Sequence, residues 1–121
     1  MKPQRIQLKR TEGFNLQAVS MAMNGLPAVK CARPGKWGNP IKAGMSCWEA
    51  GEAIAEKFGA RVDVQDSPHS AAIAVKLYRW CLENVADSGF DTDDLRGKNL
   101  ACFCPLDKPC HCDVLLELAN R

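Results

Sequence analysis

The stretch ACFCPLDKPCHCDV, residues 101–114, holds the densest group of chemically active side chains in the chain. Thiolate and imidazole groups bind zinc, thiolates act as nucleophiles, and pairs of cysteines form disulfides. The spacing C-x-C-x5-C-x-C therefore leaves several chemistries open. The residues concerned are Cys102, Cys104, Cys110, His111, Cys112 and Asp113.

The first half of this stretch is predicted to be a strand over residues 99–104. Side chains alternate along a strand, so Leu100, Cys102 and Cys104 share one face, while Ala101 and Phe103 share the other. Cys102 and Cys104 therefore point the same way.

A helix is predicted to begin near Pro109 or Cys110 and to run to Ala119. In a regular helix Cys110 and Cys112 lie about 200° apart, so both cannot reach one metal ion. A zinc site made of all four sulfurs then requires the helix to start after Cys112, with Asp113 as its N-cap. A disulfide between Cys104 and Cys110 is disfavoured in a reducing compartment.

A ligand site is the alternative to zinc. In open α/β sheets, ligands collect at the carboxyl ends of strands and at the helix N-termini that follow. Cys104, Cys110, His111 and Asp113 would meet there, with either cysteine as thiolate, His111 as acid or base, and Asp113 as orienter or helix cap. The simpler interpretation makes Cys102 and Cys112, with Cys104 as a further candidate, small core side chains and His111 a satisfied core histidine.

The loop from residue 32 to 44 contains a second motif, RPGKWGNP. Arg33 and Lys36 are suited to neutralise a phosphate or carboxylate, Trp37 to stack on a flat ring, and Asn39 to bond a heteroatom edge. The same residues also suit a tight turn in which Trp37 fills the core and Asn39 holds the backbone. No P-loop or dinucleotide-binding motif is present.

The remaining elements predict an α/β fold with a mixed or partly parallel sheet, about three helices and a Rossmann-like general layout. Strands are expected over residues 5–9 and 28–31, and residues 13–23 are ambiguous. The capping box Ser46-Cys47-Trp48-Glu49 opens one helix that ends at Gly59. A longer helix is expected to start with Ser67 as cap and Pro68 as its first residue, and its apolar face to pack on the sheet.

Composition limits the class of protein. A chain of 121 residues suits one domain, 1–121, and no apolar run is long enough for a membrane span. Seven cysteines without a signal peptide favour reduced thiols in the cytoplasm. A net charge of +2 supports nucleic-acid binding only weakly.

With both motifs considered, the chain resembles the domain of unknown function family 4326, found in phage and bacterial proteins. KPQRIQLKRTEG, RPGKWGNP, AVKLYRWCL and LRGKNLACFCPLDKPCHCDVLLELAN carry the resemblance over nearly the whole length. In that pattern position 112 is commonly a small residue, which makes Cys112 look incidental. The phage setting that the resemblance implies, with a host-cytoplasm location, favours nucleotide or modified-base chemistry.

We therefore expect a pocket for a nucleotide, nucleoside or related anionic ligand, walled by the RPGKWGNP loop and the Cys/His cluster. Neither a cofactor nor catalysis is required by this hypothesis, although an enzyme of nucleotide or DNA-modification metabolism fits it. The first alternative is a zinc-stabilised binding module, with Cys102, Cys104, Cys110 and either His111 or Cys112 as ligands. The second alternative is a phage–host interaction protein without catalysis.

Overall fold

Three parallel strands form the centre of the fold in the computed structural model, which describes residues 2–33, 35–86 and 90–121. The strands β1 (Arg5–Gln7), β2 (Ala28–Lys30) and β3 (Asn99–Cys102) lie in the order β1-β3-β2. Both strand pairs of this sheet are parallel, with Ile6 opposite Ala101 and Val29 opposite Leu100. The predicted α/β class is confirmed, and all three predicted strands exist with one to two residues fewer at their ends.

Four α-helices and one 3-10 turn accompany the sheet in the described residues. They are α1 (Leu16–Asn24), α2 (Cys47–Phe58), α3 (Ala71–Asn84), η2 (Thr92–Leu95) and α4 (His111–Ala119). The ambiguous segment is thus a helix, with Asn15 as its N-cap. None of these helices has the length and hydrophobicity needed to cross a bilayer.

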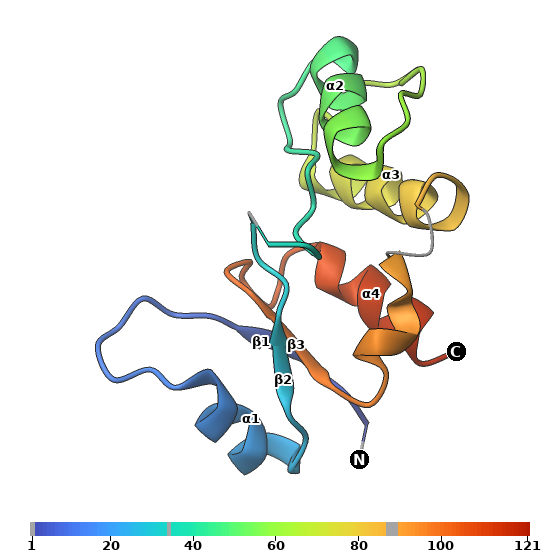
Figure 1. Cartoon of the computed structure of the whole chain (residues 1–121). Coiled ribbons are helices and arrows are strands. Elements are labelled where there is room, and N and C mark those ends of the chain that lie inside the picture. The colour runs from blue at the N-terminus through green and yellow to red at the C-terminus, as the bar shows by residue number, and fades with distance from the viewer. Residues whose placement is uncertain (1, 34, 87–89) are drawn as a thin grey trace.

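The sheet separates two apolar layers. On one face, the side covered by α1, Ile6 and Ala101 pack with Leu16 and Phe103. On the other face, Leu100 and Cys102 join the larger core formed with α2, α3 and α4 (Figure 1). The predicted alternation along β3 is therefore confirmed, and helices cover both faces of the sheet as in doubly wound folds.

Helix α4 is the element that connects the sheet to the rest of the larger core. It contacts β1, β3, η2 and α3 (Figure 1). The prediction that α3 packs directly on the sheet was wrong, because α4 lies against β3 and presents its own outer face to α3. Arg79 of α3 and Glu117 of α4 form an ion pair across that helix contact.

The helix boundaries follow their caps. Ser46 and Glu49 form the predicted capping box of α2, and Gly59 ends that helix with a φ of 78°. The start predicted for α3 was wrong by three residues, because the side chain of Ser70, and not that of Ser67, accepts a hydrogen bond from the third helical N–H. Pro68 instead lies buried before the helix, and its carbonyl accepts a hydrogen bond from the N–H of Gly44.

A buried polar network joins β3 to α1. Asn99 is fully buried, and its Nδ2 donates to Ser20 Oγ at 2.7 Å and to Asn24 Oδ1 at 2.8 Å. Its Oδ1 accepts hydrogen bonds from Asn24 Nδ2 at 2.9 Å and from the N–H of Gln4 at 2.8 Å. Every polar atom of this amide is paired, so the network fixes the position of β3 in the sheet.

We expect Asn99→Asp to lower the free energy of unfolding by about 3 kcal/mol, because a carboxylate replaces two donors and faces two acceptor oxygens in a buried site. Asn120→Asp at the exposed end of α4 is the matched control and should cost less than about 1 kcal/mol. Urea denaturation of both variants measures the difference. Equal losses in the two variants would contradict the importance of the network.

Candidate metal and ligand site

Three sulfur atoms meet at the carboxyl end of β3. Cys102 is the last residue of that strand, Cys110 is the N-cap of α4, and Cys112 lies in the first turn of α4. Their Sγ atoms all lie within 4.8 Å of one another, and those of Cys102 and Cys110 are 2.8 Å apart. All three residues are buried. We call Cys102, Cys110 and Cys112 the sulfur cluster.

The prediction that Cys110 and Cys112 cannot reach one metal ion was wrong, because the helix begins at His111 and Cys110 precedes its first residue. Cys110 is the N-cap, with φ −146° and ψ 145°, so its side chain does not follow the helical rotation. Its Sγ accepts a hydrogen bond from the N–H of Cys112 at 3.5 Å. Cys110 therefore also takes the capping position that the zinc alternative gave to Asp113.

A second group of donors overlaps the first at Cys110. The Sγ atoms of Cys104 and Cys110 and a ring nitrogen of His111 lie within 4.8 Å of one another. His111 is buried, its Nε2 lies 2.5 Å from the carbonyl oxygen of Cys31, and its Nδ1 lies 3.7 Å from Cys110 Sγ. Because a carbonyl oxygen only accepts, Nε2 carries the proton in the neutral ring and the lone pair of Nδ1 faces the sulfur atoms.

The thiols titrate together because they share hydrogen bonds. Hydrogen bonds from Cys110 and then Cys112 lower the pKa of Cys102 to about 3. Hydrogen bonds with Cys102 and Cys110 raise the pKa of Cys112, and burial raises the pKa of Cys104 to about 12. Although the hydrogen bond with Cys102 acts to raise it, the pKa of Cys110 is lowered as well, with hydrogen bonds to Cys112 and His111 acting in that direction. The shared hydrogen bonds therefore favour negative charge on the Cys102–Cys110 pair.

Arg5 binds the loop between Cys104 and Cys110. Its side chain is 8% exposed although it begins at the edge strand β1. The guanidinium donates to the carbonyl oxygens of Pro105 at 3.0 Å, Leu106 at 2.6 Å and Lys108 at 3.1 Å. It also pairs with the carboxylate of Asp113 at 3.1 Å.

The same guanidinium lies close to the sulfur atoms. Burial acts to lower the pKa of Arg5, but attraction to Asp113 and to Cys110 outweighs burial and raises that pKa. Arg5 is therefore a fixed positive charge beside the sulfur cluster. The carboxylate of Asp113, predicted to orient a catalytic group, lies in this ion pair with its side chain 57% exposed.

The RPGKWGNP loop has the geometry of the tight-turn alternative. Trp37 is 7% exposed, meets Phe90 edge-on at 5.9 Å, and its carbonyl accepts a hydrogen bond from Tyr78 Oη at 2.7 Å. Asn39 is buried, donates to the carbonyl of Ala74 at 3.2 Å and accepts from the N–H of Ile41 at 2.9 Å. Ligand contacts by Trp37 and Asn39 stay a prediction.

The two charged residues of the loop differ. Arg33 binds the backbone of its own loop, because its Nε donates to the carbonyl of Asn39 and its Nη2 to that of Ile41 at 3.1 Å. Lys36 is exposed and its Nζ lies 5.0 Å from the centre of the Trp37 ring. Gly38 permits this closure, since a Cβ there would lie 2.8 Å from the Cα of Arg33.

Two hollows touch this loop. The strand-end hollow, of about 220 Å³, is lined by Arg10, Ala32, Arg33, Cys102, Phe103, Cys104 and His111. The loop hollow, of about 550 Å³, is lined by Arg33, Asn39, Lys42, Lys57, Phe90 and their neighbours. Of the four predicted ligand-binding residues, Arg33 is the one that lines a hollow with Cys104 and His111, while Asn39 lies at the loop hollow.

Sequence reasoning did not single out Arg5, Arg10 or Phe103. Arg5 enters the sequence prediction only as part of the strand over residues 5–9, Arg10 directly follows that strand, and Phe103 is assigned only to a strand face. The available signal was position, because each residue lies in a predicted strand or directly after it. In a parallel sheet, residues just beyond each strand meet at one edge.

The family model described as Domain of unknown function (DUF4326) matches residues 6–121. The chain therefore belongs to that family, and the resemblance stated from its motifs is confirmed. Neither the curated proteins nor the solved structures contain a match to the chain.

We expect Arg5→Gln to lower the free energy of unfolding by about 2 kcal/mol, because three carbonyl oxygens and one carboxylate lose a charged donor. Arg79→Gln removes an arginine from an exposed pair between α3 and α4, and should cost at most about 1 kcal/mol. Thermal and urea unfolding measure both variants. A smaller loss in Arg5→Gln than in Arg79→Gln would contradict the role given to Arg5.

Proposed function

We propose that this DUF4326 protein is a zinc-stabilised binding module that holds a nucleotide-like anionic ligand beside its metal centre. The observation that carries the metal half is the convergence of three buried sulfur atoms within 4.8 Å. If these cysteines only filled space in the core, their three thiols would not need to point toward one another. The half-buried Cys104 and the buried His111 extend the same donor set through Cys110.

Zinc fits the chemistry of these donors. Thiolate and imidazole are the ligands that structural zinc sites use, and such sites take four ligands. Several thiolates around one divalent ion leave net negative charge, and the guanidinium of Arg5 lies where it offsets that charge. A reducing compartment such as the cytoplasm keeps the cysteines available as thiolates.

In this proposal the sulfur cluster would supply three ligands, and the fourth would come from His111 or Cys104, which meet the cluster at Cys110. The geometry of His111 favours it, because metal-binding histidines commonly donate their second ring N–H to a carbonyl or carboxylate. Nε2 of His111 makes that contact with the carbonyl of Cys31. If His111 is the ligand, Cys104 is left free at the strand-end hollow, where the predicted nucleophilic role would apply to it.

The metal would join parts of the chain that are distant in sequence. Cys102 ends the central strand and Cys110 starts the helix that contacts β1, β3 and α3. Between them lies the 105–109 loop, which is exposed and forms no helix or strand. Binding energy of a structural metal is also folding energy. Zinc would therefore stabilise the junction between the sheet and the larger core.

The ligand half of the proposal is supported by the strand-end hollow. It brings two arginines, an aromatic ring, Cys104 and His111 together at the edge of the sheet. Ligands of open α/β proteins bind at this edge. A nucleotide offers the negative charge that such a hollow would recognise.

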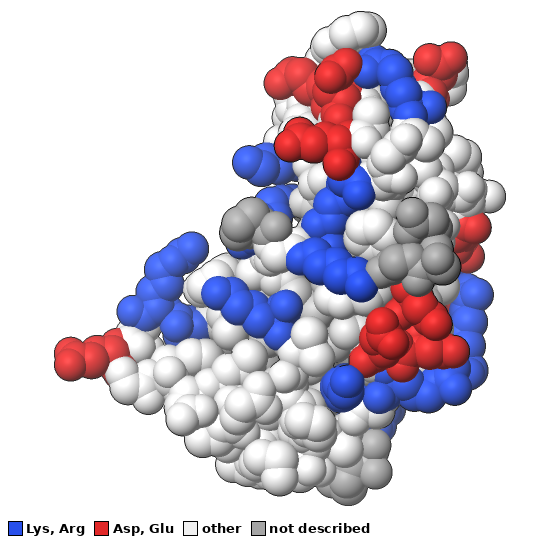
Figure 2. All heavy atoms as spheres, in the orientation of Figure 1, with Lys and Arg blue, Asp and Glu red and all other residues white. Residues whose placement is uncertain are grey.

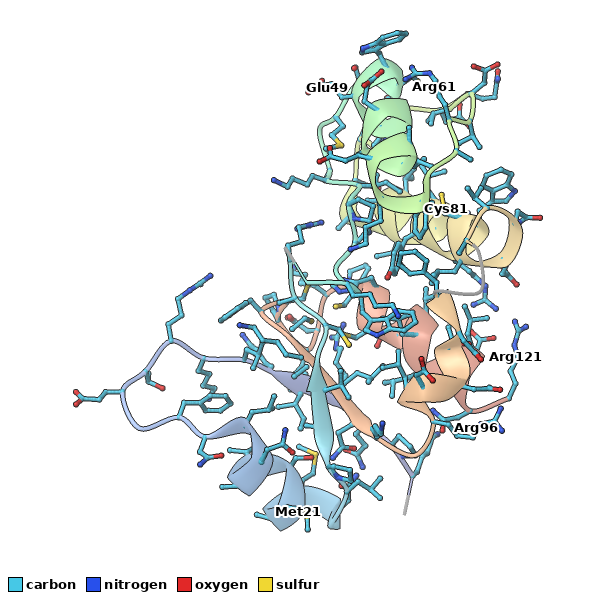
Figure 3. All side chains as sticks on the ribbon, viewed as in Figure 1. Met21, Glu49, Arg61, Cys81, Arg96 and Arg121 are labelled. Carbon is cyan, nitrogen blue, oxygen red and sulfur yellow. The ribbon has the colours of Figure 1, made fainter. Side chains whose placement is uncertain are left out.

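We expect the purified protein to contain one zinc ion per chain, measured by elemental analysis, and a strong chelator to lower its melting temperature. Cys102→Ser should lose most of the zinc, because serine does not replace a thiolate ligand. Cys81→Ala is the matched control, since Cys81 is also buried but lies on α3 outside the cluster (Figure 3). Zinc-free wild-type protein with the same stability would refute the metal centre.

A second prediction concerns the fourth ligand. We expect His111→Asn to weaken zinc affinity by about 10- to 100-fold or more, and Cys104→Ser to leave it nearly unchanged. Competition with a chromogenic chelator measures both affinities. The reverse order would assign the fourth position to Cys104, and normal affinity in both variants would limit the site to the sulfur cluster.

A further inference from the structure

We propose that the strand-end hollow binds the phosphate group of a phosphate monoester, held between Arg10 and Arg33. This inference rests on the ligand half of the proposed function and names the chemical group that the hollow binds and the two side chains that hold it. Neither Arg10 nor the hollow formed with it follows from the two sequence motifs.

The hollow lies where all three strands end. Arg10 follows β1, Ala32 and Arg33 follow β2, and Phe103 and Cys104 follow β3. Parallel pairing carries these segments to the same edge of the sheet. The first turn of α4 contributes His111 to the same wall.

Arg10 is oriented by an aromatic ring. Its guanidinium carbon lies 4.0 Å from the centre of the Phe103 ring, and Nζ of Lys30 lies 5.7 Å from the same centre. A guanidinium that stacks on a ring keeps its N–H groups in its own plane, directed outward at the ring edge. Arg10 is thus held in place while its donors stay available to an anion.

Arg33 supplies the second cation, and its position is fixed by the loop. Two of its nitrogens donate to the carbonyls of Asn39 and Ile41. The guanidinium has five N–H donors, so donors remain for a ligand. Two arginines fixed by packing and backbone contacts form a pre-organised site for the planar, bidentate recognition of phosphate oxygens.

Size and charge select the ligand class. None of the residues that line the hollow in the described part of the chain is acidic. Its volume of about 220 Å³ is below the roughly 300–1,000 Å³ of sites that enclose a drug-sized molecule. The hollow therefore holds a phosphate group, and the rest of the ester extends outside.

The loop hollow is the less suitable of the two. It contains Lys42 and Lys57, but Lys57 Nζ donates to the carbonyl of Gly35 at 2.8 Å and Glu56 lines the same wall. Figure 2 shows that basic side chains continue across this face, between the loop after β1 and the near end of α2. Such a surface attracts anions to both hollows, so the test must distinguish them.

Calorimetric titration with a nucleoside 5′-monophosphate, its unphosphorylated nucleoside and inorganic phosphate tests the site at one fixed salt concentration. The variants are Arg10→Gln at the strand-end hollow and Lys42→Gln at the loop hollow, which lose the same charge from exposed positions. We expect the monophosphate to bind wild type at least about tenfold more tightly than the nucleoside does. Arg10→Gln should weaken monophosphate binding at least about tenfold, and Lys42→Gln less than about twofold.

Equal losses in the two variants, or a loss only in Lys42→Gln, would overturn the proposed location while leaving ligand binding intact. Inorganic phosphate that binds as tightly as the monophosphate would overturn the ester and assign the hollow to free phosphate. A wild type that binds none of the three probes overturns this inference together with the ligand half of the proposed function. Zinc content, measured in the same samples, decides the metal half separately.

Discussion

The packing of Cys110 against the end of β3 is the contact on which the rest of the structure depends. As N-cap, Cys110 sets where α4 begins, and as a buried sulfur 2.8 Å from Cys102 Sγ it sets where α4 lies on the sheet. Helix α4 packs in turn against α3, and the larger core joins both helices to α2. The position of one side chain thus links the central strand to most of the helical layer.

Hydrogen bonds with two other elements support that contact. Arg5 reaches from β1 to the loop between the cysteines, while His111 reaches from α4 to the carbonyl of Cys31 after β2. The ends of β1 and β2 are therefore tied to the same helix start. A site that takes supports from three strands and a helix is rigid enough to bind a metal or ligand with defined geometry.

Much of the fold was predictable because it follows from local rules. The alternation of Leu100, Ala101 and Cys102 and the capping box at Ser46 depend on residues close in sequence. The neighbours of the cysteine site could not be predicted, because they depend on the order in which the strands pair. The sequence alone does not say that β3 lies between β1 and β2, and this order is what brings Arg5 and Arg10 to the cysteines.

The wrong prediction about Cys110 and Cys112 came from the position of one helix boundary. Helical rotation was applied to a residue that proved to be the cap, and a cap has extended backbone angles. A start one residue earlier would have placed Cys110 within the helical rotation, where the two thiols diverge. The chemistry of the site therefore depends on a single boundary, because it decides whether the sulfur atoms of this family member converge on one point.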